Sequence, residues 1–349
     1  MLASQNSFYH KVPFMSRGNK IPPEWKRWIA ENRMLHVKDE RILAVLIRNG
    51  FGEEVAKRQI SSVSKTTSYQ AGTWVAHRYR KLESLLEVYR QLSILSEEPI
   101  ERRSNIGRDE FLAKYYAPNR PVIITGMMTK WKALSLWTPE YLKKQCGDMI
   151  VEITAGRQSD PQYELNLEKH KIKLRFRDYI DMVLSGGETN DYYLVANNFF
   201  FKEAGAKLLY EDIEQFPEYL NDIKGTENGS LWFGPAGTVT PLHHDLMNIL
   251  VAQVYGRKRF TLIPSNHVHL LYNEKGVFSE IDLEQPDLIQ HPMFQDVKLQ
   301  EVVLEPGEVL FVPVGWWHHV RALDIAITVS FINFLFPNTY SWNNPQIYR

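Results

Sequence analysis

Two pairs of adjacent histidines lie in the second half of the chain, in short apolar segments that alternate like β-strands. The first pair precedes an aspartate, in the order His243, His244, Asp245, and the second pair is His318 with His319. Residues i and i+2 of a strand point to the same side, so His243 and Asp245 can aim an imidazole and a carboxylate at one point. His244 is then predicted to face away.

The residues that follow the second pair distinguish its two members. His318 shares its parity with the apolar residues Val320 and Ala322, so we expect it to point inward. His319 shares its parity with Arg321 and is expected to face solvent. The inward member of this pair is therefore His318.

Two imidazoles and one carboxylate, with no fourth protein ligand evident, are typical of a non-haem Fe(II) site that keeps coordination positions open for substrates. Each segment alone is a weak signal, because a His-x-Asp pattern is common and a histidine beside tryptophans is usually a packed core residue. At the ends of neighbouring predicted strands, His243, Asp245 and His318 together indicate one metal centre.

A lysine is the third chemical feature. Gly256 and Arg257 predict a hairpin turn, and in the next strand Lys258 shares a face with Phe260 and Leu262, so it should point inward. Desolvating an unpaired ammonium costs several kcal/mol, so an anion is expected to meet it. That anion could be a small dicarboxylate cosubstrate. It could also be an internal acidic side chain, or the lysine could lie at a barrel rim where its ammonium reaches water.

These residues must be positioned by strands and helices. From residue 231 onward, short apolar strands alternate with Gly and Pro turns, which predicts a β-rich barrel or sandwich. Between residues 111 and 195 predicted helices and strands alternate, so the fold class is α+β with helices flanking the barrel. A loose, flexible tail is expected over residues 1–20 and a helical appendage with a polar linker over 21–72. Residues 73–349 then form the main domain.

The main domain is expected to open with a leading helix. Its apolar residues recur at spacings of three and four between residues 74 and 95, as in an amphipathic helix. We expect this helix to pack onto the domain that follows it. A coiled-coil dimer would need more heptads than the segment holds.

Composition limits the classes of protein that the chain can belong to. The 349 residues are 44% hydrophobic and 23% charged, which excludes disorder over most of the chain. Lys+Arg and Asp+Glu both number 41, so no net charge attracts nucleic acid or an anionic membrane. The single cysteine, Cys146, excludes an internal disulfide and a cysteine zinc cluster. Since no long apolar run is present, a cytoplasmic protein is expected.

The spacing of these motifs resembles that of the JmjC, or cupin-like, family of Fe(II)- and 2-oxoglutarate-dependent oxygenases, particularly its small protein hydroxylases. The match consists of Gly237, five residues, His243, one residue, Asp245 and later Gly256, then Gly307, five residues, Pro313, four residues, His318. The Glu ligand of four-ligand cupins would fall at Ile249, which favours the oxygenase arrangement. The resemblance covers roughly residues 97–337 and implies a double-stranded β-helix, the jelly-roll barrel.

The resemblance also implies cofactors and their ligands. Fe(II) would be held by His243, Asp245 and His318, with 2-oxoglutarate and O2 in the open positions. Family members bind the distal carboxylate of 2-oxoglutarate with a lysine, a hydroxyl residue and a tyrosine. The positions that correspond to these are Lys258, Thr240 and Tyr193, with Tyr192 as the second choice of tyrosine, and Asn248 is a further candidate beside the cosubstrate.

The implied activity is hydroxylation of an amino-acid side chain in a protein or peptide. Demethylation of N-methyl-lysine uses the same iron chemistry and stays open, although no zinc-binding or chromatin-reading motif accompanies the barrel. A metal-binding cupin-like protein without oxygenase activity and a pure binding module also stay open, whereas a tRNA substrate has no support from the net charge. Relatives dimerise through helices at the chain ends, so the resemblance allows a homodimer.

Overall fold

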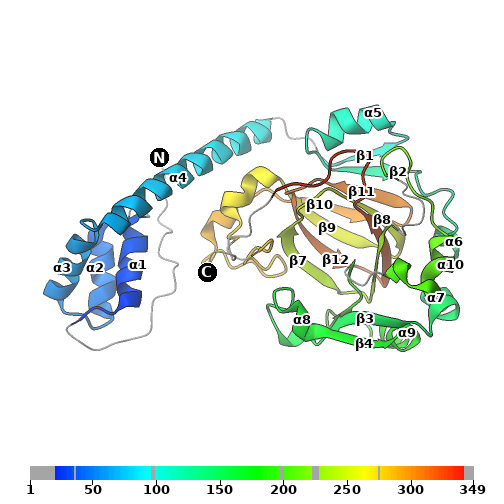
Figure 1. The fold of residues 1–349 in the computed structure, drawn as a ribbon, viewed down its shortest axis with the longest axis horizontal. Coiled ribbons are helices and arrows are strands. Elements are labelled where there is room, and N and C mark those ends of the chain that lie inside the picture. The colour runs from blue at the N-terminus through cyan, green and yellow to red at the C-terminus, as the bar shows by residue number, and fades with distance from the viewer. Residues whose placement is uncertain are drawn as a thin grey trace. The chain divides into compact units, whose positions relative to one another are not determined.

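The computed structural model describes residues 20–34, 37–95, 99–196, 200–221, 228–273 and 276–341 (Figure 1). The expected tail over residues 1–20 lies outside these ranges except for Lys20. By its internal contacts the chain divides into two units. One consists of Met1–Ser96 with Asp287–Asp296, and the other of Glu97–Pro286 with Val297–Arg349.

The first unit contains four α-helices, α1 (Pro23–Met34), α2 (Asp39–Arg48), α3 (Glu53–Val63) and α4 (Thr67–Leu95), among its described residues. The first three helices agree with the expected helical appendage, and their apolar faces share one core. Trp25 and Trp28 are buried there with an edge-to-face ring contact at 5.4 Å between centroids. Gly50 ends α2 with a left-handed backbone, φ 87°, which glycine adopts without strain.

Residues 61–72 do not form the expected polar linker. They are helical to Val63 and again from Thr67, because the hydroxyl of Thr66 accepts a hydrogen bond from the Tyr69 amide and so starts a new helix. The contacts also group α4 with the first unit, so the division falls near Ser96 and not at residue 72. Polar residues without proline are compatible with helix, and the polarity of this segment therefore misled the prediction.

Helix α4 carries a broad apolar surface. None of its residues is buried, and from residue 74 its large hydrophobic side chains are exposed. They are Trp74, Val75, Tyr79, Leu82, Leu85, Val88, Tyr89, Leu92, Ile94 and Leu95. Packing of this helix onto the following domain stays a prediction.

Two large β-sheets form the centre of the second unit. One sheet has the order β1 (Glu101–Ser104), β2 (Val122–Thr125), β11 (Glu308–Val312), β8 (Ile249–Tyr255), β13 (Ala326–Phe331) and β6 (Ser230–Gly234). The other has the order β10 (Gln300–Leu304), β9 (Lys258–Ile263), β12 (Trp317–Ala322) and β7 (Val239–His244). All pairings are antiparallel except β1 with β2. Phe260 and Leu262 of the smaller sheet pack against Leu310 of the larger one, so a shared core lies between them.

Helices flank the sheets of this unit. They are α5 (Arg108–Phe111), a π-helical turn at Leu112–Tyr116, α6 (Ala133–Leu136), α7 (Pro139–Cys146), α8 (Leu167–His170), α9 (Phe176–Ser185) and α10 (Lys207–Tyr210). A third sheet joins β4 (Lys171–Arg175), β3 (Ile150–Ala155) and β5 (Tyr192–Tyr193). The main hydrophobic core joins residues of α7 and α9 to β8, β11 and β13. Thr138 caps α7 by accepting a hydrogen bond from the Tyr141 amide.

The predicted α+β class is confirmed as two facing, mainly antiparallel sheets with flanking helices. The closed double-stranded β-helix barrel is not found, since no strand of the described residues belongs to both sheets. Among the described helices, none combines the length and apolarity needed to cross a membrane.

Candidate metal centre

The two histidine segments meet because β7 and β12 are antiparallel neighbours. Their register places His318 opposite His243, and Asp245 directly follows the last residue of β7. The ligand atoms of these three side chains lie within 4.8 Å of one another. His318 Nε2 is 3.3 Å from Asp245 Oδ2, and the two imidazole centroids are 4.1 Å apart. Both imidazoles and the carboxylate can therefore touch one ion.

Backbone carbonyls orient the two imidazoles. Nδ1 of His243 lies 2.8 Å from the Pro241 oxygen, and Nδ1 of His318 lies 3.1 Å from the Trp316 oxygen. A carbonyl oxygen only accepts, so each Nδ1 carries the proton and each Nε2 keeps a lone pair. Hydrogen bonds of this kind fix the ring orientation of metal-binding histidines.

The protonation states also suit a cation. Burial lowers the pKa of His243 to about 4, and the neighbouring His318 contributes to this shift, so the His243 imidazole is neutral at pH 7. Burial alone would raise the pKa of Asp245, but the close imidazole of His318 and the other nearby histidines lower it overall. A neutral imidazole and an ionised carboxylate are the forms that bind metals. The residues present therefore fit Fe(II), which prefers this ligand set.

A cavity that is partly open to solvent lies beside the three ligands. Its lining includes six of the seven residues that the sequence predicted for the site, namely His243, Asp245, His318, Lys258, Thr240 and Tyr193. Its walls are otherwise mainly apolar and come from both sheets, with Ile249, Val251, Phe260, Val312 and Val320 among them.

Lys258 is the basic residue of this cavity. Its side chain points inward and is only 3% exposed, which excludes a lysine that reaches water at a rim. Nζ donates a hydrogen bond of 2.9 Å to the Tyr193 hydroxyl. Among the described residues no carboxylate pairs with Lys258, so the expectation of an internal acidic partner also fails there. Burial lowers its pKa to about 7, because the charged form lacks a counter-ion.

Tyr193 complements this lysine. Burial raises the pKa of its hydroxyl above the usual value, so the hydroxyl stays protonated. It accepts from Lys258 and still has a proton to donate to an anion. Tyr192, the second choice of tyrosine, donates instead to the Met182 carbonyl at 2.8 Å, away from the cavity lining.

Asn248 is not brought to the cavity with the others. Its side-chain oxygen accepts from the Val314 amide at 2.8 Å, and its side-chain nitrogen donates to Asn338 and Tyr340. These bonds tie the start of β8 to Val314, between β11 and β12, and to the chain after β13. The amide thus has partners within the protein, and its role beside a cosubstrate stays a prediction.

The second member of each histidine pair lies outside the metal cluster. The ring of His244 packs against Trp317 at 4.8 Å, as expected of a residue that faces away. The expectation that His319 faces solvent is wrong, since it is only 2% exposed. Its parity does place it on the outer face of the sheet, but Glu284, from a segment distant in sequence, lies 3.5 Å from its Nε2.

Two residues near Lys258 and Tyr193 were not predicted. Trp232 lines the cavity, with its ring centre 5.9 Å from Lys258 Nζ, and donates to the Ser330 hydroxyl. Arg157, 1% exposed, lies behind Tyr193 and donates to the Val239 carbonyl at 2.7 Å. Alternation in β6 could have found Trp232, but nothing local in the sequence points to Arg157.

Comparison with known proteins identifies the class. The cupin-like domain family matches residues 108–340, and the chain belongs to this JmjC-related family. It is 32% identical to lysine-specific demethylase 8 of Xenopus tropicalis over 244 residues, which is 68% of this chain and 53% of that protein. It is also 32% identical to lysine-specific demethylase JMJ30 of Arabidopsis thaliana over 269 residues, 74% of this chain and 60% of that protein.

A differently named relative also matches. The chain is 30% identical to human HSPB1-associated protein 1 over 234 residues, 60% of this chain and 46% of that protein. The chain spans about half the length of the curated relatives it matches.

Proposed function

We propose that this chain is an Fe(II)- and 2-oxoglutarate-dependent oxygenase that hydroxylates an amino-acid side chain in a protein or peptide. The observation that carries the proposal is one cavity with a His-Asp-His ligand set and a buried lysine that has no acidic partner among the described residues. The metal ligands alone would also suit a cupin-like protein without oxygenase activity. The unpaired cation beside them favours an enzyme that binds a dicarboxylate.

The residues that line the cavity would have separate roles in binding the ion and the cosubstrate. His243, Asp245 and His318 hold the ion from one side, so its remaining positions face the cavity. Lys258 and Tyr193, with Thr240 nearby, bind the distal carboxylate of 2-oxoglutarate. The apolar walls exclude water and strengthen these charged contacts. Bound Fe(II), with 2-oxoglutarate and O2, supplies the oxidising chemistry.

Two substrate classes compete for this site. Membership of the family and relatives named for lysine demethylation support N-methyl-lysine in a protein as the second candidate. Both candidates share the metal centre, and they differ in the product that leaves. A hydroxylase retains the oxygen on its substrate, whereas a demethylase releases formaldehyde.

Turnover of 2-oxoglutarate tests the oxygenase proposal. Purified protein with Fe(II), ascorbate and 2-oxoglutarate should form succinate, and Asp245→Ala, which removes one metal ligand, should not. Equal succinate formation by both proteins, or none by either, would reject the proposal. Mass spectrometry of peptides from a treated lysate should then show the gain of one oxygen atom. Formaldehyde release from methyl-lysine peptides without such a gain would select the demethylase instead.

A further inference from the structure

The strand that carries His243 lies at the edge of its sheet. In the order β10-β9-β12-β7, strand β7 has only β12 as a neighbour among the described strands of the sheet. An edge strand presents one row of backbone amides and carbonyls that its own sheet does not pair. A metal ligand on this strand needs support from its second side.

A short segment after β9 supplies that support. The His244 amide donates to the Val277 carbonyl at 3.1 Å, and the Ser279 amide donates to the Leu242 carbonyl at 2.9 Å. Between these bonds Phe278 forms a β-bridge with His243, and their ring centroids are 5.5 Å apart. The metal ligand is thus held between β12 and this segment, and Phe278 forms a wall beside its imidazole.

The turn that contains this segment is closed by its own hydrogen bonds. The Glu280 amide donates to the Tyr272 carbonyl, and the Ser279 hydroxyl donates to the Leu271 carbonyl at 2.6 Å. The Asn273 side chain donates to the Phe278 carbonyl at 2.8 Å. These bonds shape the turn, but they do not attach it to β9 or β12.

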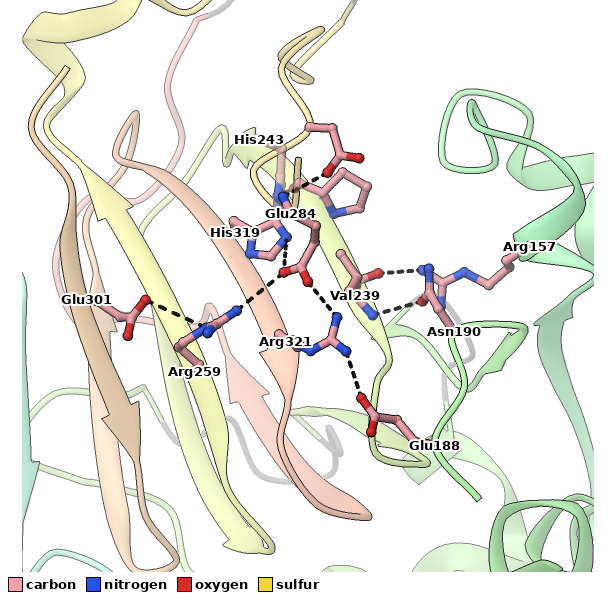
Figure 2. Close-up of polar contacts among 12 residues, drawn as sticks. Arg157, Glu188, Asn190, Val239, His243, Arg259, Glu284, Glu301, His319 and Arg321 are labelled. Atoms are coloured by element: carbon pink, nitrogen blue, oxygen red, sulfur yellow. Dashed lines mark hydrogen bonds and ion pairs between the residues drawn. The ribbon is translucent and has the colours of Figure 1, made fainter. Parts of the chain in front are cut away.

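Glu284 makes that attachment. Its carboxylate accepts from Arg321 of β12 at 2.6 Å and from Arg259 of β9 at 3.4 Å, and it lies 3.5 Å from His319 Nε2 (Figure 2). Figure 2 shows Glu284 at the centre of these three side chains on the outer face of the sheet. The carboxylate is 28% exposed and the two guanidinium side chains are 33% and 26% exposed. A partly buried carboxylate shared by two arginines is a stronger tie than an exposed ion pair.

We propose that Glu284 is a positioning residue for the metal centre. By bridging β9 and β12 it holds residues 276–284 against the outer edge of β7, and this segment fixes His243 for coordination. The inference rests on the proposed metal site and adds a residue to it that touches neither the ion nor the cosubstrate. Outer partners of metal ligands commonly change metal affinity by about 10–100-fold when they are removed.

The test measures metal binding by the apo full-length protein, with Co(II) as the probe and its visible absorption as the signal. Glu284→Ala should weaken Co(II) binding by about 10–100-fold, and Glu284→Asp should recover part of the loss. Should Glu284→Ala fail to fold, Glu284→Gln keeps the shape and removes the charge. Hydrogen exchange at the His244 and Ser279 amides should also become faster, because their partners are released.

Two control variants replace acidic residues that contact the same two arginines as Glu284 but do not belong to residues 276–284. Glu301 lies 3.7 Å from Arg259 and is 57% exposed, and Glu188 lies 2.7 Å from Arg321 and is 66% exposed. Glu301→Gln and Glu188→Gln should bind Co(II) like the wild type. If Glu284 acted only through the general stability of the sheet, Co(II) affinity would fall in every variant in proportion to its loss of melting temperature. That result would overturn the inference.

Failure of the role of Glu284 and failure of the proposed function give different results. Wild-type protein that binds Co(II), with Glu284→Gln binding it equally and with unchanged amide exchange, rejects the role of Glu284 alone. Wild-type Co(II) binding that is unaffected by His243→Ala rejects the metal centre itself and the positioning role with it.

Discussion

We expect replacement of Lys258 with Met to raise the stability of the folded protein and to weaken its binding of the cosubstrate. Methionine keeps the length and the apolar contacts of the side chain but cannot carry charge. Burial holds the pKa of Lys258 at about 7 instead of 10.5. At pH 7.5, keeping this amine neutral in the folded chain costs about 4 kcal/mol, because the same amine is protonated in the unfolded chain. Lys258→Met removes this cost and so stabilises the folded chain, but it also removes the hydrogen bond to Tyr193, which lowers the stabilisation by about 1 kcal/mol.

The free energy of unfolding of the apo protein should therefore rise by a few kcal/mol in Lys258→Met at pH 7.5. The sign follows from the lowered pKa, since the unfolded chain binds a proton that the folded chain has lost between pH 7 and 10.5. The wild type then becomes more stable as the pH rises through this window, and the variant lacks this contribution. The stability difference between them should be largest at pH 7 and below, and shrink toward pH 10.5.

Binding of 2-oxoglutarate should change in the other direction. A hydrogen bond to a charged group contributes about 1.5–3 kcal/mol, so the apparent affinity should fall about 10- to 150-fold in Lys258→Met. Denaturant unfolding of the apo protein at several pH values measures stability, and calorimetry with Mn(II) present measures 2-oxoglutarate affinity. A variant that is less stable at pH 7.5 and binds 2-oxoglutarate normally would refute the reasoning about this lysine.

The pH dependence of cosubstrate binding, the role of Trp232 and the apolar face of α4 give three more tests. Since 2-oxoglutarate favours the charged form of Lys258, the affinity of the wild type for 2-oxoglutarate should weaken by up to about tenfold per pH unit above pH 7. Calorimetry in buffers of different ionisation enthalpy should detect proton uptake on binding. An affinity that does not change with pH would contradict this prediction. Trp232→Phe removes the 2.9 Å bond to Ser330 and should weaken 2-oxoglutarate binding a few-fold, less than Lys258→Met, as judged by the same titration. If the apolar face of α4 pairs two copies, light scattering should give a dimer mass that Leu82→Glu reduces to a monomer mass; a monomeric wild type would exclude the homodimer.

The alternation of side chains along strands was sufficient to predict which candidate metal ligands and which lysine point into the cavity. His243 and Asp245 come from one strand end, and His318 and Lys258 take their inward direction from the apolar residues that share their parity. This works because a strand's side chains alternate strictly, whatever the rest of the fold does. The antiparallel pairing of β7 with β12 was then needed only to bring the two histidines to one point.

Features that depend on distant segments could not be predicted in this way. Parity correctly placed His319 on the outer face of its sheet, but its burial comes from Glu284, which lies 35 positions earlier in the chain. Arg157 reaches Tyr193 only through the fold. The polar composition of residues 61–72 suggested a linker, but in the structure this segment is helical because α4 packs against α1. The two helices are so close at Gly72 that a Cβ atom there would clash with Met34.

A crystal structure of the full chain with Mn(II) and 2-oxoglutarate, grown without O2, tests the central claim most directly. One Mn(II) should bind to His243 Nε2, His318 Nε2 and an Asp245 oxygen, with the distal carboxylate of 2-oxoglutarate on Lys258 Nζ and the Tyr193 hydroxyl. A metal bound elsewhere, or a 2-oxoglutarate that avoids Lys258 in a structure with the metal in place, would contradict the claim.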